Sequence, residues 1–204
     1  MRRAKPGKGY LLTIVVAVLA MIAVPSTYLF ASTKLEEVKV VYEKRIQVIT
    51  SRAEEFADNL SIALTYMDTA RDDLKNARLN LEKTIFWMDE KEYDRMRNSS
   101  FDAIFYFNRS NTLFRKSLSY LLYSKNSSTK EYEKVLDLYI NYTRSAINLT
   151  HYGVLISRCL ENVSISRAEE WMEDYEELNE YYDRYDKEMK SYLIQIKDYC
   201  GIRE

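Results

Sequence analysis

Helix-breaking residues are nearly absent from this chain after its first thirty positions. From residue 34 to the C-terminus there is no proline, and glycine occurs only at Gly153 and Gly201. Proline interrupts a helix because it has no backbone N–H, and glycine destabilises a helix interior by about 1 kcal/mol relative to alanine. The sequence therefore permits unusually long helices, and we expect an all-α fold.

Apolar residues recur at alternating intervals of three and four positions along the first expected helix, from about Lys34 to Met88. This spacing places them on one side of the helix, as in a coiled coil. Large residues alternate with alanine, so we expect a neighbouring helix to approach closely. The series consists of Ile46, Ile49, Ala53, Phe56, Leu60, Ala63, Met67, Ala70, Leu74, Ala77 and Leu81.

Three further helices are expected. One runs from about Glu92 to Lys125, and two more begin at the capping boxes Ser128-x-x-Glu131 and Ser166-x-x-Glu169. The connections between them are short, which makes neighbouring helices antiparallel. The predicted fold is all-α: an N-terminal transmembrane helix continuing into a stalk and an extracytoplasmic antiparallel four-helix bundle.

The N-terminal thirty residues predict a membrane anchor. Four basic residues precede residue 10, and an apolar run then extends over residues 10–31. At 1.5 Å per residue this run spans about 33 Å, close to the thickness of a bilayer core. Basic residues at the N-terminal end favour an inside N-terminus. The expected organisation is a cytoplasmic tail at 1–9, a signal anchor at 10–31, a helical stalk at 32–54 and a bundle at 55–204.

Two alternatives for this segment stay open. Pro25 before a stretch of small residues is compatible with a cleaved secretory signal. Lys8-Gly9-Tyr10 followed by an apolar helix is similar to the leaders of archaeal type IV pilin-like proteins. That resemblance covers the first thirty residues, and it implies cleavage after Gly9 and a filament built through residues 10–31.

Asparagine is followed two positions later by serine or threonine more often than chance predicts. With 11 Asn and 28 Ser and Thr among 204 residues, chance gives about 1.5 such sequons, the acceptor pattern for N-glycosylation. The chain has seven, all on the expected outer side, which predicts a glycoprotein. A polar helical surface that happens to carry these residues is the alternative. The acceptors are Asn59, Asn98, Asn108, Asn126, Asn141, Asn148 and Asn162.

The two cysteines, Cys159 and Cys200, fall near the ends of the third and fourth expected helices. In an up-down-up-down bundle these ends lie about 50 Å apart, whereas a disulfide needs Cα atoms within about 7 Å. A bond within the chain therefore requires a broken helix, for which Gly153 is the one plausible position. Unpaired thiols and a bond between two chains are the alternatives.

Little in the sequence supports catalysis. A single histidine, His151, cannot supply the paired ligands that di-metal sites in bundles use, and no catalytic or nucleotide-binding motif is present. We therefore expect no enzyme, no catalytic or metal site and no cofactor. The charge balance of 30 basic and 31 acidic residues argues against nucleic-acid binding. The tyrosines of the fourth helix predict either core packing or a partner face, the latter formed by Tyr175, Tyr182 and Tyr185.

The function predicted from these features is a non-enzymatic, N-glycosylated cell-surface protein with a structural, accessory-subunit or protein-interaction role. Its expected partners are the membrane, N-linked glycans and a protein or a second copy. The fourth helix, which has no sequon after Asn162, is the expected contact surface. A ligand-binding or sensory ectodomain, with a pocket between helices lined by Tyr139, Tyr142, Tyr182 and Tyr185, is the alternative, together with the pilin-like filament subunit.

Overall fold

A computed structural model describes the backbone of residues 8–161 and 168–201 and the side chains of 33–161 and 172–201. The described residues are almost entirely helical, which confirms the all-α prediction. The chain divides into two compact units, residues 1–51 and 52–204, and each is described by itself. The helices are α1 (Lys8–Asp89), α2 (Tyr93–Ser127), α3 (Lys130–Glu161) and α4 (Ala168–Tyr199).

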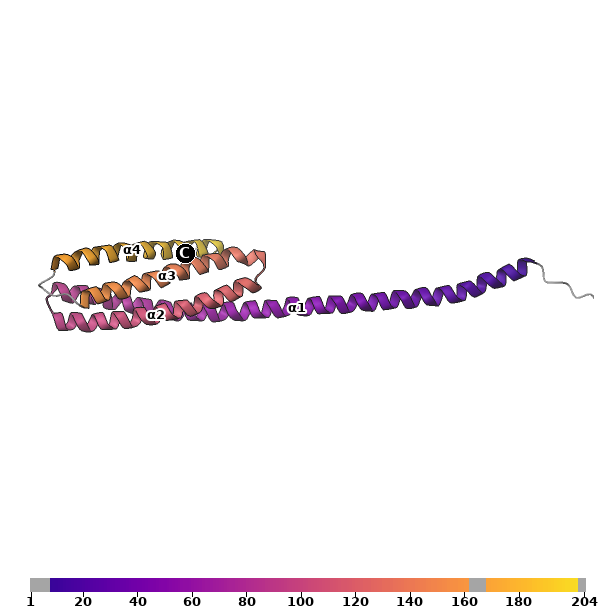
Figure 1. The fold of residues 1–204 in the computed structure, drawn as a ribbon, viewed down its shortest axis with the longest axis horizontal. Helices are drawn as coiled ribbons and strands as arrows, with labels where there is room; N and C mark the ends of the chain where they lie inside the picture. The colour runs from indigo at the N-terminus through magenta and orange to yellow at the C-terminus, as the bar shows by residue number, and fades with distance from the viewer. Residues whose placement is uncertain (1–7, 162–167, 202–204) are drawn as a thin grey trace, which may run out of the picture. The chain divides into compact units, whose positions relative to one another are not determined.

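Residues 52–204 form an antiparallel bundle, in which the C-terminal part of α1 lies beside α2, α3 and α4 (Figure 1). Hydrogen bonds between neighbouring helices follow this antiparallel order. The Ser117 hydroxyl donates to the Ala63 carbonyl across α1 and α2, at 2.8 Å. Asn111 of α2 donates to the Ile147 carbonyl of α3, at 2.8 Å. The Tyr199 hydroxyl of α4 donates to the Glu131 carbonyl of α3, at 3.0 Å.

Fully buried small residues of α1 and α2 lie where these two helices meet. We call these residues the small seam. Here the hydroxyl of Ser110 donates to the Ala70 carbonyl at 2.7 Å, as Ser117 does to Ala63. A side chain of two heavy atoms can reach a carbonyl of the facing helix only when the two backbones lie close together, so the predicted close approach at the alanines is confirmed. The small seam consists of Ala63, Ala70 and Ala77 of α1 with Ala103, Ser110 and Ser117 of α2.

The turn from α1 to α2 depends on one left-handed residue. The N–H of Glu92 bonds to the Trp87 carbonyl at 2.9 Å, and the N–H of Lys91 bonds to the Met88 carbonyl at 3.0 Å. This pair of bonds is the Schellman arrangement, and Lys91 occupies its left-handed position with φ of 60°. Glycine is favoured there because a Cβ crowds the backbone at positive φ.

We therefore expect Lys91→Gly to raise the free energy of unfolding by about 1 kcal/mol. Urea denaturation followed by circular dichroism measures this change. The control is Glu90→Gly, one residue earlier, where φ is negative and glycine should lower the stability by about 0.5–1 kcal/mol. Destabilisation by both variants would contradict the assignment of Lys91 as the strained residue.

The predicted capping box at Ser128 is wrong. The Ser128 hydroxyl and N–H both donate to the Lys125 carbonyl, at 2.8 and 3.3 Å. Ser128 therefore caps the C-terminal end of α2 and does not begin α3. Thr129 directly precedes α3, and its carbonyl accepts from Tyr132. The connection is two residues long, so one serine could not be assigned to the correct helix from spacing alone. The second box, at Ser166, begins outside the described residues.

The sequence predicts a location in the cell membrane, with the N-terminus inside and the bulk of the chain outside. The structure contradicts this prediction. Within the part of the chain that the structure describes, no helix is both long enough and apolar enough to span a bilayer. From Lys34 onward, charged side chains recur along the helices, whereas a membrane span needs about 20 predominantly apolar residues. The side chains of residues 10–31, on which the anchor, signal and leader predictions rest, lie outside the described residues.

Candidate functional site

The first candidate surface is an exposed apolar repeat on α1. The three-and-four spacing that predicts the bundle core continues toward the N-terminus, and we call this continuation the exposed seam. Its apolar members are 60–74% exposed, whereas Ala63 to Leu81 in the same repeat are at most 8% exposed. One helix thus presents the same pattern in a buried and an exposed form. The exposed seam consists of Leu35, Lys39, Tyr42, Ile46 and Ile49.

The second candidate is a groove of about 400 Å³ on the bundle, between α1 and α4. Buried Leu74, Tyr142 and Met189 form its apolar floor. Cationic side chains from both helices line it, namely Arg71, Lys75 and Arg78 of α1 and Lys190 of α4. A local excess of positive charge is notable in a chain whose net charge is −1.

Arg78 is the most buried of these cations, with 31% of its side chain exposed. It pairs with Asp186, which also bonds to Lys190 at 2.6 Å. Burial alone would lower the pKa of Arg78, but Tyr182 and Asp186 raise it above its ordinary value. The Nε of Arg78 is buried and has no hydrogen-bond partner among the described residues. Such an unsatisfied charged donor is costly, since buried polar groups are usually hydrogen-bonded.

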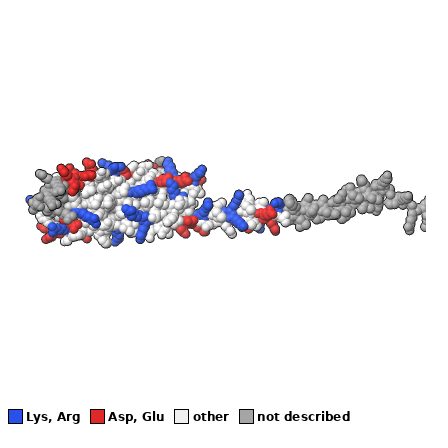
Figure 2. Space-filling view, in the orientation of Figure 1, with Lys and Arg blue, Asp and Glu red and all other residues white. Residues whose placement is uncertain are grey.

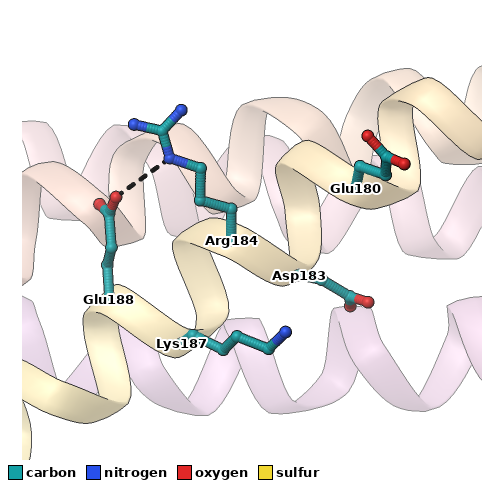
Figure 3. A pocket seen from close by; sticks show the side chains of 5 residues that line it. All are labelled: Glu180, Asp183, Arg184, Lys187 and Glu188. Carbon is teal, nitrogen blue, oxygen red and sulfur yellow. Dashed lines mark hydrogen bonds and ion pairs between the residues drawn. The ribbon is translucent and has the colours of Figure 1, made fainter.

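Two other surface depressions each lie on a single helix. One is lined by Phe105, Asn108, Arg109, Thr112, Leu113 and Lys116 of α2. The other is formed by α4 alone, where Figure 3 shows side chains that fan out to both sides of the helix rather than converge. Its one drawn interaction joins Arg184 Nε to Glu188 Oε1 at 3.3 Å. Figure 2 shows acidic and basic side chains interspersed over the visible face of the bundle. We find no converging chemistry in either depression.

The structure places the three tyrosines of the expected partner face against the bundle. Tyr175, Tyr182 and Tyr185 are half-buried and pack on the hydrophobic core. Tyr182 meets Phe107 edge-on at 6.2 Å, and Tyr185 stacks on Tyr152 at 5.6 Å. Their rings therefore pack against other residues of the same chain. Of the four tyrosines predicted to share a pocket, Tyr142 lines the groove and the other three do not.

The six acceptor asparagines that the structure describes lie in helices rather than in the surface loops where glycan acceptors usually occur. Asn98, Asn108, Asn126 and Asn148 are exposed, Asn59 and Asn141 are half-buried, and Asn162 is outside the described residues. Their glycosylation stays a prediction.

In four sequons the serine or threonine two positions later is buried, and it has a structural use that the sequence did not reveal. Ser100 donates to the Ser157 carbonyl and Ser110 to Ala70, which joins neighbouring helices. Thr143 donates to Tyr139 and Thr150 to Ala146 within α3. The spacing of these hydroxyls therefore follows in part from the packing of the bundle.

Cys159 is half-buried, Cys200 is exposed, and no disulfide joins them. Burial raises the pKa of the Cys159 thiol, and Asp174 near the start of α4 raises it further. Cys200 instead lies in the field of Tyr139, toward the other end of α3. The bond within the chain is therefore not formed, and a bond between chains stays a prediction.

Gly153, the position at which a bond within the chain would have required a broken helix, does not interrupt α3, which continues through it. A Cβ at this position would lie 2.5 Å from Cε1 and Cζ of Phe107. The absence of a side chain at Gly153 thus leaves the space that the Phe107 ring of α2 occupies.

Within the described residues, no group of three or more His, Cys, Asp or Glu side chains is placed to hold a metal ion. His151 is exposed, and its ring lies 5.5 Å from that of Tyr152. Comparison of the chain with protein-family models, curated proteins and solved structures finds no match.

Proposed function

We propose that this chain is a non-enzymatic structural protein that self-associates through the exposed seam of α1. The observation that carries the proposal is the contrast along one repeat: its members are buried from Ala63 to Leu81 and exposed from Leu35 to Ile49. Exposed apolar residues in a row mark an interaction surface, because contact of apolar area with water costs about 25 cal/mol per Å². Four of the five members of the exposed seam are apolar, and Lys39 is the exception.

The pattern favours a second copy as the partner. A coiled-coil partner must carry the same repeat of 3.5 residues, so that its apolar side chains meet those of α1. The corresponding stripes of α2 and α3 are already buried in the bundle. The exposed seam of a second chain has the required spacing and the required exposure.

Charged residues beside the exposed seam favour a parallel pair. Arg45 and Arg52 lie on one flank, seven residues apart. In an antiparallel pair centred on Ile46 and Ile49, Arg45 of one chain would face Arg52 of the other, and like charges there oppose association. A parallel pair places Arg45 opposite Thr50 and Arg52 opposite Ala57 of the second chain, so neither arginine meets a like charge. The one like-charge contact of the parallel pair is between the two copies of Lys39 in the exposed seam.

The test compares Ile46→Asp/Ile49→Asp with the wild-type chain by sedimentation velocity over a range of concentrations. We expect the wild type to associate, and the variant to associate at least 100-fold more weakly, since each buried isoleucine contributes about 1.5–3 kcal/mol. Val40→Asp is the matched control: it adds a charge at an exposed position outside the exposed seam. A monomeric wild type, or equal weakening by Val40→Asp, would overturn the proposal.

A further inference from the structure

We propose that the groove between α1 and α4 is a binding site for an amphiphilic anion, a carboxylate or phosphate group carried on an apolar chain. This inference is independent of self-association through α1, because every residue that it uses lies within the bundle. It assigns a ligand class to a surface that the sequence did not single out.

The positive charge of the groove is greater than its own acidic groups neutralise. Arg71, Lys75, Arg78 and Lys190 are the cations among the described lining residues. The acids are Glu82 at the rim, Asp186, which bonds to both Arg78 and Lys190, and Asp68, which lies 3.8 Å from Arg71. The excess of one positive charge comes from cations on two helices that face one another, so an anion between them would interact with both.

Below the cations the surface is apolar. Leu74 and Met189 are buried, and half-buried Leu193 extends this floor along α4. A volume of about 400 Å³ lies within the range of small-molecule sites, which are mostly apolar with a few polar groups that fix the orientation of the ligand. Charge at the rim and apolar surface beneath it match a ligand with a charged head and an apolar chain.

Arg78 gives an independent reason to expect an anion. Its guanidinium is held by Asp186, yet its Nε–H is buried without a hydrogen-bond partner among the described residues. Guanidinium groups bind carboxylate and phosphate oxygens through two parallel N–H bonds. A ligand oxygen at the floor of the groove would satisfy this donor once the side chains that cover it shift. Tyr142, whose hydroxyl lies in the fields of Arg71 and Arg78, places a further polar group beside it.

The experiment is isothermal titration calorimetry of the full chain with decanoate, decanol and inorganic phosphate. Decanoate has both the charge and the chain, decanol lacks the charge, and phosphate lacks the chain. We expect saturable binding of one decanoate per chain and about ten-fold weaker binding of each of the other two probes. Added salt should weaken decanoate binding, because the groove is open to solvent.

The variant Arg71→Gln/Lys75→Gln should bind decanoate at least ten-fold more weakly, since one hydrogen bond to a charged group is worth about that factor. These two positions are exposed, so folding should be preserved, whereas Arg78 itself supports the bundle. Lys83→Gln removes a charge from α1 outside the groove and should leave binding unchanged. No saturable decanoate binding, equal binding of decanol or phosphate, or an equal loss in Lys83→Gln would overturn the proposal.

Discussion

Gly153→Ala is expected to lower the free energy of unfolding by about 2 kcal/mol. The new Cβ would lie 2.5 Å from the buried ring of Phe107. Overpacking of a core costs about 1–3 kcal/mol, and we place this contact at the upper end because the ring has no exposed surface. Alanine regains about 1 kcal/mol through its higher helix propensity. Urea denaturation measures the net change.

A double-mutant cycle with Phe107→Leu identifies the contact responsible. The smaller side chain leaves space for the Cβ, so the two substitutions together should cost at least 1 kcal/mol less than the sum of their separate effects. Additive effects, or a more stable Gly153→Ala variant, would show that the ring does not limit this position.

The second large effect is expected for Asp186→Asn, which should lower the free energy of unfolding by about 2 kcal/mol at pH 7. The substitution removes the counter-ion of Arg78 and the partner of Lys190. Breaking a fully buried ion pair costs about 3–5 kcal/mol. We expect less here, because 17% of the Asp186 side chain and 31% of the Arg78 side chain remain exposed and are screened by solvent.

The cost of Asp186→Asn should depend on pH. Burial raises the pKa of Asp186, but contacts with Lys190 and Arg78 lower it by more, so the folded pKa lies below the ordinary value of 3.8. The stabilisation is therefore complete above about pH 4 and is lost as the pH falls through the folded pKa. Urea denaturation from pH 7 to pH 2 should show wild type and variant converging at the acid end.

Asp183→Asn is the control for this series. Asp183 is exposed on the same helix, and its substitution should change the stability by at most about 0.5 kcal/mol at every pH. A cost of Asp186→Asn that stays constant from pH 7 to pH 2 would mean that its carboxylate charge is not what stabilises the bundle.

Much of the bundle could be predicted because its information is local. The alternation of Met67, Leu74 and Leu81 with alanine specifies a helix, its buried side and the close approach of a neighbour. Short connections between long helices specify antiparallel neighbours. The bounds of α2, Tyr93–Ser127, differ from those expected by one residue at the start and two at the end.

The features that could not be predicted depend on what lies opposite a residue in space. Gly153 in a helical pattern is compatible with a break or with a large neighbour, and only the position of Phe107, 46 residues earlier, decides between them. Arg78 and Asp186 are 108 residues apart, and many other pairings were equally compatible with the sequence. The groove could not be predicted for the same reason, since its charge excess arises from the alignment of α1 with α4.

The buried sequon hydroxyls set an order of events. A transferase that recognises Asn-x-Ser or Asn-x-Thr must have access to the hydroxyl as well as to the asparagine. In the folded bundle the hydroxyls of Ser100, Ser110, Thr143 and Thr150 are buried and already donate to backbone carbonyls. Any such modification at the four corresponding asparagines would therefore be confined to the chain before its helices pair. At these positions, the modification can occur only before the chain folds.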